Sequence, residues 1–487
     1  MEKKLYSKDI QEDDITMLKT KIICTMGPAC DSIDLLKEMI QAGMTVARLN
    51  MAHGELEDHV KRIENVRQAA KEMNTCIPVM MDIKGPEIRI GKLKEASVLL
   101  KPGSQLILTT EEILGDEHRI SVNYPDMPKD IKAGDRILID DGLVDLTVTS
   151  IEGTEMICNI VSGGILKPRK GVNLPGIHTT LPGVTERDVK HIQFGVEQRI
   201  ELIAASFVRK GDDIREIREI LKGHHAEHVQ IYSKIENAEG MENLDDIIEA
   251  SDGIMVARGD LGVEVPIQDV PVMQKEMIDK CNLVGKPVIV ATHMLESMQV
   301  NPRPTRAEVS DVFNAVMQGA DVVMLSGESA AGKYPVESVR TMAAVAASAE
   351  SQLDYQEQFD KRRARQSTNI TEVISQGAVS SSLELDAKAI ITSTASGFTA
   401  RMVSKYRPKA PIIAVTPNNT VFAKICLLSG VFPIKGDKVA TTDEMFESSI
   451  RNALNAGYIH KGDTVVLSAG VPVAEAGTTN LIRVYQA

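Results

Sequence analysis

Short, nearly continuous apolar segments recur along the first two thirds of the chain, and most are separated by amphipathic stretches with helical periodicity, such as 55–73. Uninterrupted apolar segments of this length are typical of parallel strands that are buried on both faces of a sheet. The segments span 20–28, 45–54, 77–86, 200–209, 229–237, 253–260, 286–294 and 321–329. A strand followed by a helix, repeated in this way, predicts an α/β fold with a closed (β/α)8 TIM barrel.

The repeat is interrupted once, between the third and fourth segments. There the sequence changes to short stretches of alternating apolar and polar residues, which predicts a small, mostly antiparallel β domain. An insertion at this place lies above the carboxyl ends of the barrel strands, where barrel active sites form, so we expect a lid. After the eighth segment, further apolar segments at 387–394, 410–417, 462–470 and 480–487 alternate with helices and predict a separate α/β domain. The expected parts are an N-terminal extension at 1–19, the barrel at 20–86 and 173–350, the lid at 87–172 and the C-terminal α/β domain at 351–487.

Composition and charge limit the classes of function. The chain has 487 residues, 43% apolar and 25% charged, as is ordinary for a globular protein of several domains. Its net charge of -13 argues against a nucleic-acid partner, because phosphate backbones require a basic surface. The cysteines show no C-x-x-C pair, as expected of reduced thiols. No segment has the length of a membrane span or the apolar core of a secretory signal, so we expect a cytoplasmic protein without a membrane partner.

Charged and polar residues stand at the ends of the predicted barrel strands. Lys234 and Glu236 are two positions apart, so they project from the same face of one strand. Taken alone, this pair is most simply a structural ion pair where a strand meets solvent. The carboxyl ends of barrel strands converge on one mouth, however, which would bring several such residues together. They are Arg48, Asn50, His53, Asp82, Lys84, Lys234, Glu236, Asp260, Thr292 and His293.

The chemistry of these residues indicates a site for a metal ion and an anion. Glu236 and Asp260 are hard oxygen ligands without neighbouring Cys or His residues, and they suit Mg²⁺ or Mn²⁺ better than zinc. Arg48 and Lys234 would then face an anion with distributed charge, such as a phosphoryl group. The backbone amide of Gly259 is a candidate to receive a substrate carboxylate.

In these motifs, and along nearly its whole length, the chain resembles the pyruvate kinases. The resemblance implies a barrel domain, an inserted β lid and a C-terminal regulatory domain. It also implies transfer of the phosphoryl group of phosphoenolpyruvate to ADP, giving ATP and pyruvate as the last step of glycolysis, and it implies a homotetramer. The matching segments are, in order, TKIICTMGPA, ARLNMAHG, MDIKGPEIR, RKGVNLPG, ASFVR, SKIEN, VARGDLG, ATHMLESM, TRAEVSDV, MLSGESAAGKYP and SKYRPKAPIIAVT.

The resemblance also implies roles for individual residues. Glu236 and Asp260 match the Mg²⁺ ligands of the family. Lys234 matches the lysine that stabilises the transferring phosphoryl group and the enolate, and Arg48 would hold phosphoryl oxygens. Gly259 and Asp260 would present backbone amides to the substrate carboxylate.

Two further roles follow from the resemblance. Thr292 would lie near the carbon that is protonated when enolpyruvate becomes pyruvate; because a hydroxyl is a poor acid, we expect it to orient a water or a relay. Nucleotide contacts are implied on both the barrel and the lid, so that closure of the lid would complete the site and exclude water. The residues that match these contacts are Asn50, His53, Arg89 and Lys170.

The monovalent-cation site of the family is matched only in part. The resemblance implies K⁺ ligands at Asn50, Asp82 and the backbone carbonyl of Ile83, whereas Ala52 stands where the family has a serine. Glu87 matches the acidic residue that accompanies K⁺ dependence in the family. We therefore expect weakened or altered use of K⁺, with K⁺ still the ion.

The segment 392–399 contains hydroxyls and amides that suit a phosphate, although an ordinary Ser/Thr-rich turn fits equally well. In the family this loop binds the phosphate of a sugar-phosphate effector. Ala395 and Phe398 replace basic residues found in members activated by fructose 1,6-bisphosphate, so we expect a different phosphorylated allosteric effector, such as a monophosphate or AMP. The residues that match the family's loop are Thr394, Ser396, Gly397 and Thr399.

Two other functions remain open from the sequence. A different barrel enzyme that handles phosphoenolpyruvate or a pyruvate enolate would share the metal ligands and the lysine, but it would have no use for a lid between the third and fourth strands. A regulatory or binding protein without activity would be expected to lose Lys234 or one of the two acids, and all three residues are present.

Overall fold

The computed structural model describes residues 17–365, 369–472 and 477–487. Eight parallel strands in this part of the chain close into a barrel, so the predicted TIM-barrel fold is confirmed. Every predicted apolar segment forms one of these strands. In order around the barrel, they are β1 (Lys21–Thr25), β16 (Val322–Leu325), β15 (Val288–Ala291), β14 (Gly253–Ala257), β13 (Gln230–Ile235), β12 (Leu202–Ala205), β3 (Val79–Ile83) and β2 (Val46–Asn50).

Helices cover the outside of the barrel and bury their apolar residues against the strands. In α6 (Gly211–Gly223), for example, the buried residues Ile214, Ile217 and Leu221 follow the helical period and form one apolar face. The other helical elements of this part are η1 (Pro28–Cys30), α2 (Ile33–Gln41), α3 (Leu56–Glu72), α5 (Glu186–Glu197), α7 (Ala238–Glu242), α8 (Leu244–Ala250), α9 (Arg258–Glu264), η2 (Ile267–Asp269), α10 (Val270–Val284), η3 (Glu296–Gln299), α11 (Arg306–Gln318), α12 (Gly327–Ala330) and α13 (Pro335–Ser351).

Local signals fix the ends of α11. The Thr305 side chain accepts a hydrogen bond from the Glu308 amide, and the Glu308 carboxylate accepts a 2.7 Å hydrogen bond from the Thr305 amide. This capping box satisfies donors that the first turn of a helix leaves free. Gly319, with a φ of 102°, ends the helix in the left-handed conformation that glycine adopts most easily.

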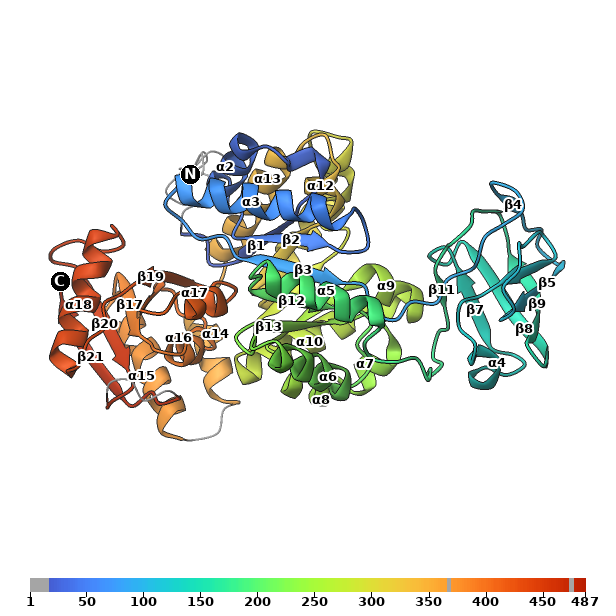
Figure 1. Ribbon diagram of the computed structural model, residues 1–487. Helices are drawn as coiled ribbons and strands as arrows, with labels where there is room; N and C mark the ends of the chain where they lie inside the picture. The colour runs from blue at the N-terminus through green and yellow to red at the C-terminus, as the bar shows by residue number, and fades with distance from the viewer. Residues whose placement is uncertain (1–16, 366–368, 473–476) are drawn as a thin grey trace, which may run out of the picture.

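The segment between β3 and β12 folds into a separate β domain with its own apolar core, as predicted. Six of its strands form one sheet, and all its pairings are antiparallel except that of β5 with β6. In Figure 1 this domain stands apart at one end of the barrel. In sheet order the strands are β11 (Val172–Asn173), β7 (Arg136–Ile139), β8 (Val144–Glu152), β9 (Glu155–Ser162), β5 (Gln105–Thr109) and β6 (Arg119–Ser121), beside the pair β10 (Ile165–Leu166) and β4 (Val98–Leu99) and the helix α4 (Met127–Asp130).

The C-terminal part forms an α/β domain at the opposite end of the barrel domain (Figure 1). Its five strands make one sheet, in which only the last strand is antiparallel to its neighbour. Four of the strands were predicted, and β19 was not. The sheet order is β19 (Val431–Lys435), β18 (Ile412–Thr416), β17 (Ala389–Ser393), β20 (Thr464–Ala469) and β21 (Leu481–Gln486), with helices α14 (Tyr355–Arg363), α15 (Ile370–Glu384), α16 (Phe398–Ser404), α17 (Asn419–Ile425) and α18 (Thr442–Asn455).

The C-terminal domain inserts a short segment into the base of the barrel. Leu427, which follows α17, is fully buried in one cluster with barrel-interior residues that include Tyr232. Arg407 adds an ion pair across the same junction, with its Nη1 at 2.7 Å from Asp321 Oδ1. The two domains therefore share both apolar and charged contacts.

Several other expectations concern the whole chain. Most of the predicted N-terminal extension, residues 1–16, lies outside the described residues. The six cysteines are all free thiols. Among the described residues, no helix combines the length and the apolar character needed to cross a membrane.

Candidate active site

The ammonium of Lys234 lies among three side-chain oxygens at the carboxyl end of β13. It is 2.9 Å from Glu236 Oε1 and 3.4 Å from Asp82 Oδ1, and it donates a 2.7 Å hydrogen bond to Ser206 Oγ. The contact with Glu236 confirms that the two side chains share a face of the strand. Burial opposes the charge, but Asp82 and Glu236 outweigh burial and raise the pKa of Lys234 above its ordinary value. Lys234 is therefore a permanent cation at the rim of the barrel.

Arg48, on β2, holds Asp82 from the other side. Its Nε donates a 2.8 Å hydrogen bond to Asp82 Oδ2, and its Nη1 donates another of 2.8 Å to Thr25 Oγ1. Burial disfavours the Asp82 carboxylate, yet Arg48 and Lys234 together hold the pKa of Asp82 below its ordinary value. One carboxylate thus stands between two cations. Ser206 Oγ also donates to Asp82, at 3.1 Å, and sequence reasoning missed this residue although it lies in the segment ASFVR.

Glu236 is fully buried, and one of its carboxylate oxygens lacks a hydrogen bond. Oε2 accepts a 2.5 Å hydrogen bond from the Phe207 amide, whereas Oε1 has the ion-pair contact with Lys234 but no hydrogen bond of good geometry. Burial raises the pKa of Glu236 to about 7; Lys234 opposes this shift and Asp260 adds to it. Asp260, in the first turn of α9, therefore acts on Glu236 as a nearby like charge.

The two carboxylates fit a divalent cation. A buried oxygen without a donor, beside a second carboxylate, is stabilised by a hard cation such as Mg²⁺ or Mn²⁺. In the described parts of the chain, no group of three or more His, Cys, Asp or Glu side chains is arranged to hold a metal ion. Protein ligands limited to one or two carboxylates, with water and substrate oxygens as the rest, are the usual arrangement for Mg²⁺.

The loop after β15 has an unusual backbone conformation beside α9. Thr292 and His293 have φ angles of 65° and 55°, which are rare for residues other than glycine and costly for a β-branched side chain. The Gly259 amide donates a 2.8 Å hydrogen bond to Thr292 Oγ1, and Arg258 Nη2 donates one of 2.6 Å to the Thr292 carbonyl. The Gly259 amide, predicted to receive a substrate carboxylate, is therefore bonded to Thr292 in this structure.

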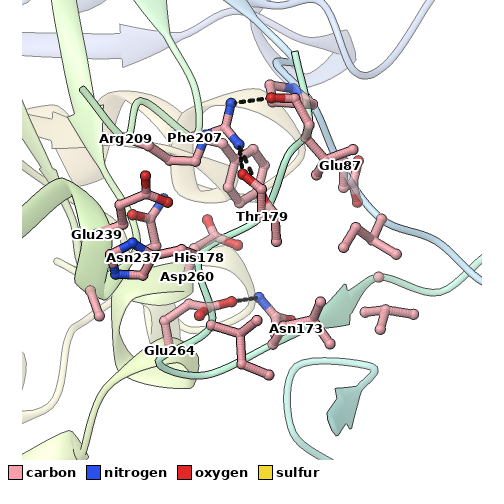
Figure 2. Close-up of a pocket in the computed structure, with 18 of the residues that line it drawn as sticks. Glu87, Asn173, His178, Thr179, Phe207, Arg209, Asn237, Glu239, Asp260 and Glu264 are labelled. Carbon is pink, nitrogen blue, oxygen red and sulfur yellow. Dashed lines mark hydrogen bonds between the residues drawn. The ribbon is translucent and has the colours of Figure 1, made fainter. Parts of the chain in front are cut away.

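A cavity of about 100 Å³ lies beside this cluster, between the barrel and the inserted domain. Figure 2 shows Asp260 and Glu264 in its wall, with Asn173 of the inserted domain donating a 2.8 Å hydrogen bond to Glu264. Arg209 donates hydrogen bonds of 3.0 Å to Thr179 Oγ1 and of 2.6 Å to the carbonyl of Leu181, and so holds the segment that returns from the inserted domain. Apart from Asp260, sequence reasoning had not singled out these residues.

The implied nucleotide contacts are divided between the two domains. Asn50 Oδ1 accepts a 3.0 Å hydrogen bond from the Ala52 amide at the barrel rim, and the His53 side chain is exposed. Arg89 and Lys170 are held by acids: Arg89 Nε is 2.7 Å from Glu87 Oε1, and Lys170 Nζ is 2.7 Å from Asp140 Oδ1. Among the described residues, neither cation forms a hydrogen bond or ion pair with Lys234, Arg48 or Asp260.

The implied K⁺ ligands are neighbours on β2 and β3. Asn50 lies opposite Asp82 in the register of the two strands, and Ile83 follows Asp82. Both oxygens of Asp82, however, are already in contact with Arg48, Ser206 or Lys234. Ala52 supplies no side-chain oxygen, and the weakened use of K⁺ stays a prediction.

The segment at 392–399 borders a cavity of about 340 Å³ in the C-terminal domain. Thr394, Ser396 and Thr399 line it, and Thr394 Oγ1 accepts a 2.9 Å hydrogen bond from the amide of Gly397, whose φ is 87°. The lining also contains Lys438, a cation that the sequence analysis had not considered. The predicted loop thus stands at a cavity whose described lining has one basic side chain, Lys438, and one acidic side chain, Asp437.

Comparison with known proteins agrees with this arrangement. The family model described as "Pyruvate kinase, barrel domain" matches residues 17–339, and the model described as "Pyruvate kinase, alpha/beta domain" matches residues 372–485. The pyruvate kinase of Bacillus licheniformis is 51% identical over 471 residues, 96% of this chain and 80% of the relative. That of Geobacillus stearothermophilus is 50% identical over 469 residues, with the same shares. That of Clostridium acetobutylicum is 50% identical over 469 residues, 96% of this chain and 99% of the relative. The chain therefore belongs to the pyruvate kinase family.

Proposed function

We propose that the cluster around Lys234 is the centre at which this enzyme transfers the phosphoryl group of phosphoenolpyruvate to ADP, giving ATP and pyruvate. The observation that carries the assignment is the fixed ammonium of Lys234, held at the barrel rim by Asp82, Ser206 and Glu236. Phosphoryl transfer depends on positioning and on neutralisation of charge more than on covalent catalysis. A permanent cation held by several partners meets both requirements.

Arg48 and Lys234 would act on the same substrate group. Both contact Asp82, which fixes the spacing between the two positive charges. Arg48 would hold the phosphoryl oxygens of phosphoenolpyruvate, and Lys234 would stabilise the phosphoryl group in flight and then the enolate oxygen. Glu236 also pairs with Lys234, but once Glu236 holds a divalent ion, Asp82 alone would compensate the two cations, and the pair would keep positive charge for an anionic substrate.

Glu236 and Asp260 would hold Mg²⁺ or Mn²⁺. The buried, unbonded Oε1 of Glu236 and the repulsion between the two carboxylates support this assignment. When bound, the ion supplies positive charge that neutralises the phosphoryl and enolate oxygens. Glu236 Oε2 also accepts the Phe207 amide and is fixed, whereas Oε1 would exchange its ion-pair contact with Lys234 for the metal ion.

Thr292 would position the proton donor for the enolate, and the amides of Gly259 and Asp260 would bind the substrate carboxylate. The Gly259 amide would exchange its bond to Thr292 Oγ1 for one to the carboxylate. Thr292 Oγ1 donates its own hydrogen to the Ala291 carbonyl at 2.6 Å, so that exchange would free the oxygen to accept a hydrogen bond from a water molecule and so orient it. Binding of the carboxylate at the Gly259 amide would thereby be coupled to release of Thr292 Oγ1 from that amide.

Nucleotide binding would require movement of the inserted domain. Asn50 and His53 would contact ADP from the barrel, and Arg89 and Lys170 from the inserted domain. In the present arrangement both of these cations are paired with acids of their own domain. Closure over a nucleotide would replace those acids with phosphate oxygens, which also excludes water from the reacting groups.

A monovalent cation is proposed at Asn50, Asp82 and the Ile83 carbonyl, with K⁺ as the ion. The missing hydroxyl at Ala52 and the contacts already made by Asp82 support a weaker site than the family's usual one. Steady-state activity with K⁺ replaced by a large organic cation tests this. Full activity without K⁺ would show that the site is not used.

The loop with Thr394, Ser396, Gly397 and Thr399 is proposed to bind a phosphorylated allosteric effector. The hydroxyl-lined cavity of about 340 Å³ and its Lys438 side chain support this role. One cation suits a monophosphate such as AMP better than a bisphosphate. Activation curves with AMP, a sugar monophosphate and fructose 1,6-bisphosphate test the choice, and strong activation by the bisphosphate would refute it. A homotetramer in the cytoplasm is proposed from the family, to be measured by sedimentation of the full chain.

A coupled assay tests the proposed function as a whole. Pyruvate formed from phosphoenolpyruvate should require ADP and a divalent cation. Pyruvate formed without ADP would indicate a different barrel enzyme acting on the same substrate. An absence of turnover, with phosphoenolpyruvate still bound, would indicate a regulatory protein.

A further inference from the structure

Arg362, on α14, is a mostly buried cation for which no acid serves as a partner in the described part of the chain. Its Nε is buried and has no hydrogen-bond acceptor, and no carboxylate among the described residues lies within ion-pairing distance. Burial and then the like charge of Arg407 lower the pKa of Arg362 to about 9. Asp321 and Asp279 offset these effects only in part, so the guanidinium is undercompensated, and desolvation of such a charge is costly.

The acids near Arg362 are already occupied by other groups. Asp321 Oδ1 accepts hydrogen bonds from Arg407 Nη1 at 2.7 Å and from the Ser429 amide at 3.1 Å. Glu350 accepts the Thr20 amide at 2.7 Å and its hydroxyl at 2.8 Å. Asp279, which also acts on Arg362, is paired with Lys275 at 2.5 Å and with Arg365 at 4.0 Å. All three carboxylates are thus already paired with other groups.

Arg362 borders a small cavity between the barrel and the C-terminal domain. Lys19, Arg362 and Arg407 line the cavity, against a single acid, Glu350. Its volume is about 30 Å³, which exceeds the roughly 10–15 Å³ needed for one water molecule but leaves no room for a phosphate ester. The cavity thus combines an excess of positive charge with space for one small particle.

The other two cations of the cavity are only partly compensated, Arg407 by its ion pair with Asp321 and Lys19 by the charge of Glu350. The Lys19 ammonium lies 3.9 Å from the centre of the Tyr355 ring, and burial, which Glu350 only partly offsets, lowers the pKa of Lys19 to about 8. Arg407 Nε, like that of Arg362, is buried without an acceptor. A water molecule would satisfy such donors but would not compensate the charge.

We propose that this cavity binds one halide-sized inorganic anion, such as chloride, between Arg362 and Arg407. The anion accepts hydrogen bonds from the two guanidinium groups and lowers their mutual repulsion. Arg362 and Arg407 both belong to the C-terminal domain, whereas Lys19 precedes β1 and Asp321, the partner of Arg407, belongs to the barrel. An anion bound at this junction therefore stabilises the contact between the two domains. The site is separate from the phosphoryl-transfer centre and does not depend on its assignment.

Thermal unfolding of the full-length protein tests the proposal. The midpoint is measured in potassium gluconate and in potassium chloride or bromide, at equal ionic strength and pH. For the wild type we expect a saturable, halide-specific rise on the order of 2 °C, because a ligand that binds only the folded state stabilises it by mass action. No halide-specific rise in the wild type would overturn the proposal.

Two variants locate the effect. Arg362→Met removes the charge and keeps an unbranched side chain, whereas Arg363→Met, at an exposed position on the same helix, is the matched control. We expect the halide response to disappear only in Arg362→Met. In gluconate this variant should be at least as stable as the wild type, because it no longer buries an unpaired charge. An unchanged halide response in Arg362→Met would refute the assignment.

Crystals grown in potassium bromide provide a test that does not depend on variants. We expect an anomalous difference peak in the cavity, within hydrogen-bonding distance of Arg362 and Arg407. Density that is fully explained by water, without an anomalous signal, would contradict the proposal.

Discussion

Thr292 Oγ1 accepts a 2.8 Å hydrogen bond from the backbone amide of Gly259, and Thr292 itself has a φ of 65°. A β-branched residue in this region of backbone space carries a cost of about 1–3 kcal/mol, which the surrounding contacts must offset. Arg258 contributes by donating a 2.6 Å hydrogen bond to the Thr292 carbonyl. The hydroxyl is thus held next to the residue that is proposed to bind the substrate carboxylate.

Thr292→Val should lower kcat on the order of 10²-fold, the lower end of the range for a positioned proton transfer. The substitution keeps the branched shape and removes only the hydroxyl. Thr292→Ser is the matched control and should stay within a few-fold of the wild type. Exchange of the methyl protons of pyruvate with solvent, measured by NMR in the presence of ATP, separates protonation from phosphoryl transfer. Equal exchange rates in the Val and Ser variants would contradict the role.

Lys234→Met should lower kcat by about 10²–10³-fold or more, because the residue is one of the fixed positive charges at the site of developing negative charge. Lys190→Met, at an exposed position on α5, is the control and should leave kcat unchanged. Phosphoenolpyruvate turnover with saturating ADP and divalent cation is the measurement. Activity of Lys234→Met close to that of the control would remove Lys234 from the mechanism.

Glu236→Gln should weaken binding of Mn²⁺ by at least about tenfold. Losses of this size are found even when the mutated group does not touch the metal and only orients one of its ligands. Gln has the same shape but no charge. Glu239→Gln alters a carboxylate in the wall of the neighbouring cavity and should have little effect. Electron paramagnetic resonance of free Mn²⁺ in titrations without substrate gives the affinities. If both variants lost the same Mn²⁺ affinity, the loss would reflect a general electrostatic effect, and Glu236 would not be a metal ligand.

The barrel was predictable because each of its strands is buried on both faces and therefore reads as a continuous apolar segment. The missed strand, β19, lies at the edge of the C-terminal sheet, is only partly buried and contains Pro433. A proline favours edge positions and weakens the strand pattern in the sequence. The same reasoning that found the central strands therefore could not find this one.

The candidate site was predictable where residues stand on strands. The contact between Lys234 and Glu236 follows from the two-residue period of a strand. The position of Asn50 opposite Asp82 follows from the order of β2 and β3 in the barrel. The hydrogen bond from Lys234 to Ser206 and the hydrogen bond from Gly259 to Thr292 depend on how loops fold at the barrel rim. Loop geometry leaves no periodic signal, so these contacts could be seen only in the structure.

Ala52→Ser should strengthen the response to K⁺ by about tenfold in the concentration needed for half-maximal activity, because one oxygen ligand contributes roughly 1.5 kcal/mol. Ala52 is half-buried beside Asn50, whose side-chain oxygen accepts its amide at 3.0 Å. The exchange therefore adds a hydroxyl without altering the backbone contact. Activity is measured across K⁺ concentrations at constant ionic strength. The same K⁺ response in both proteins would show that position 52 does not contribute to the site.

Lys21→Met should stabilise the protein at pH 7. Lys21 is 4% exposed and lines a cavity of about 550 Å³ at the base of the barrel. Burial, only partly offset by Cys426 and Glu350, lowers the pKa of Lys21 from 10.5 to about 8. A shift of this size corresponds to about 3 kcal/mol of unfavourable free energy in the charged state. Loss of the contact between the ammonium and the Phe432 ring, at 4.1 Å, reduces the expected gain to about 1–3 kcal/mol.

The pH dependence separates this explanation from a gain in packing. Between about pH 8 and 10.5 the unfolded chain holds a proton on Lys21 that the folded chain has released, so the stability of the wild type rises with pH in this window. Below pH 8 Lys21 is protonated in both the folded and the unfolded chain, and the full cost of burying its charge lowers the stability of the folded protein. The advantage of Lys21→Met should therefore be largest at pH 7 and should shrink by pH 10, whereas Lys61→Met, at an exposed position on α3, should show no such trend. Unfolding midpoints across this range decide the question, because a gain from packing alone would be the same at every pH.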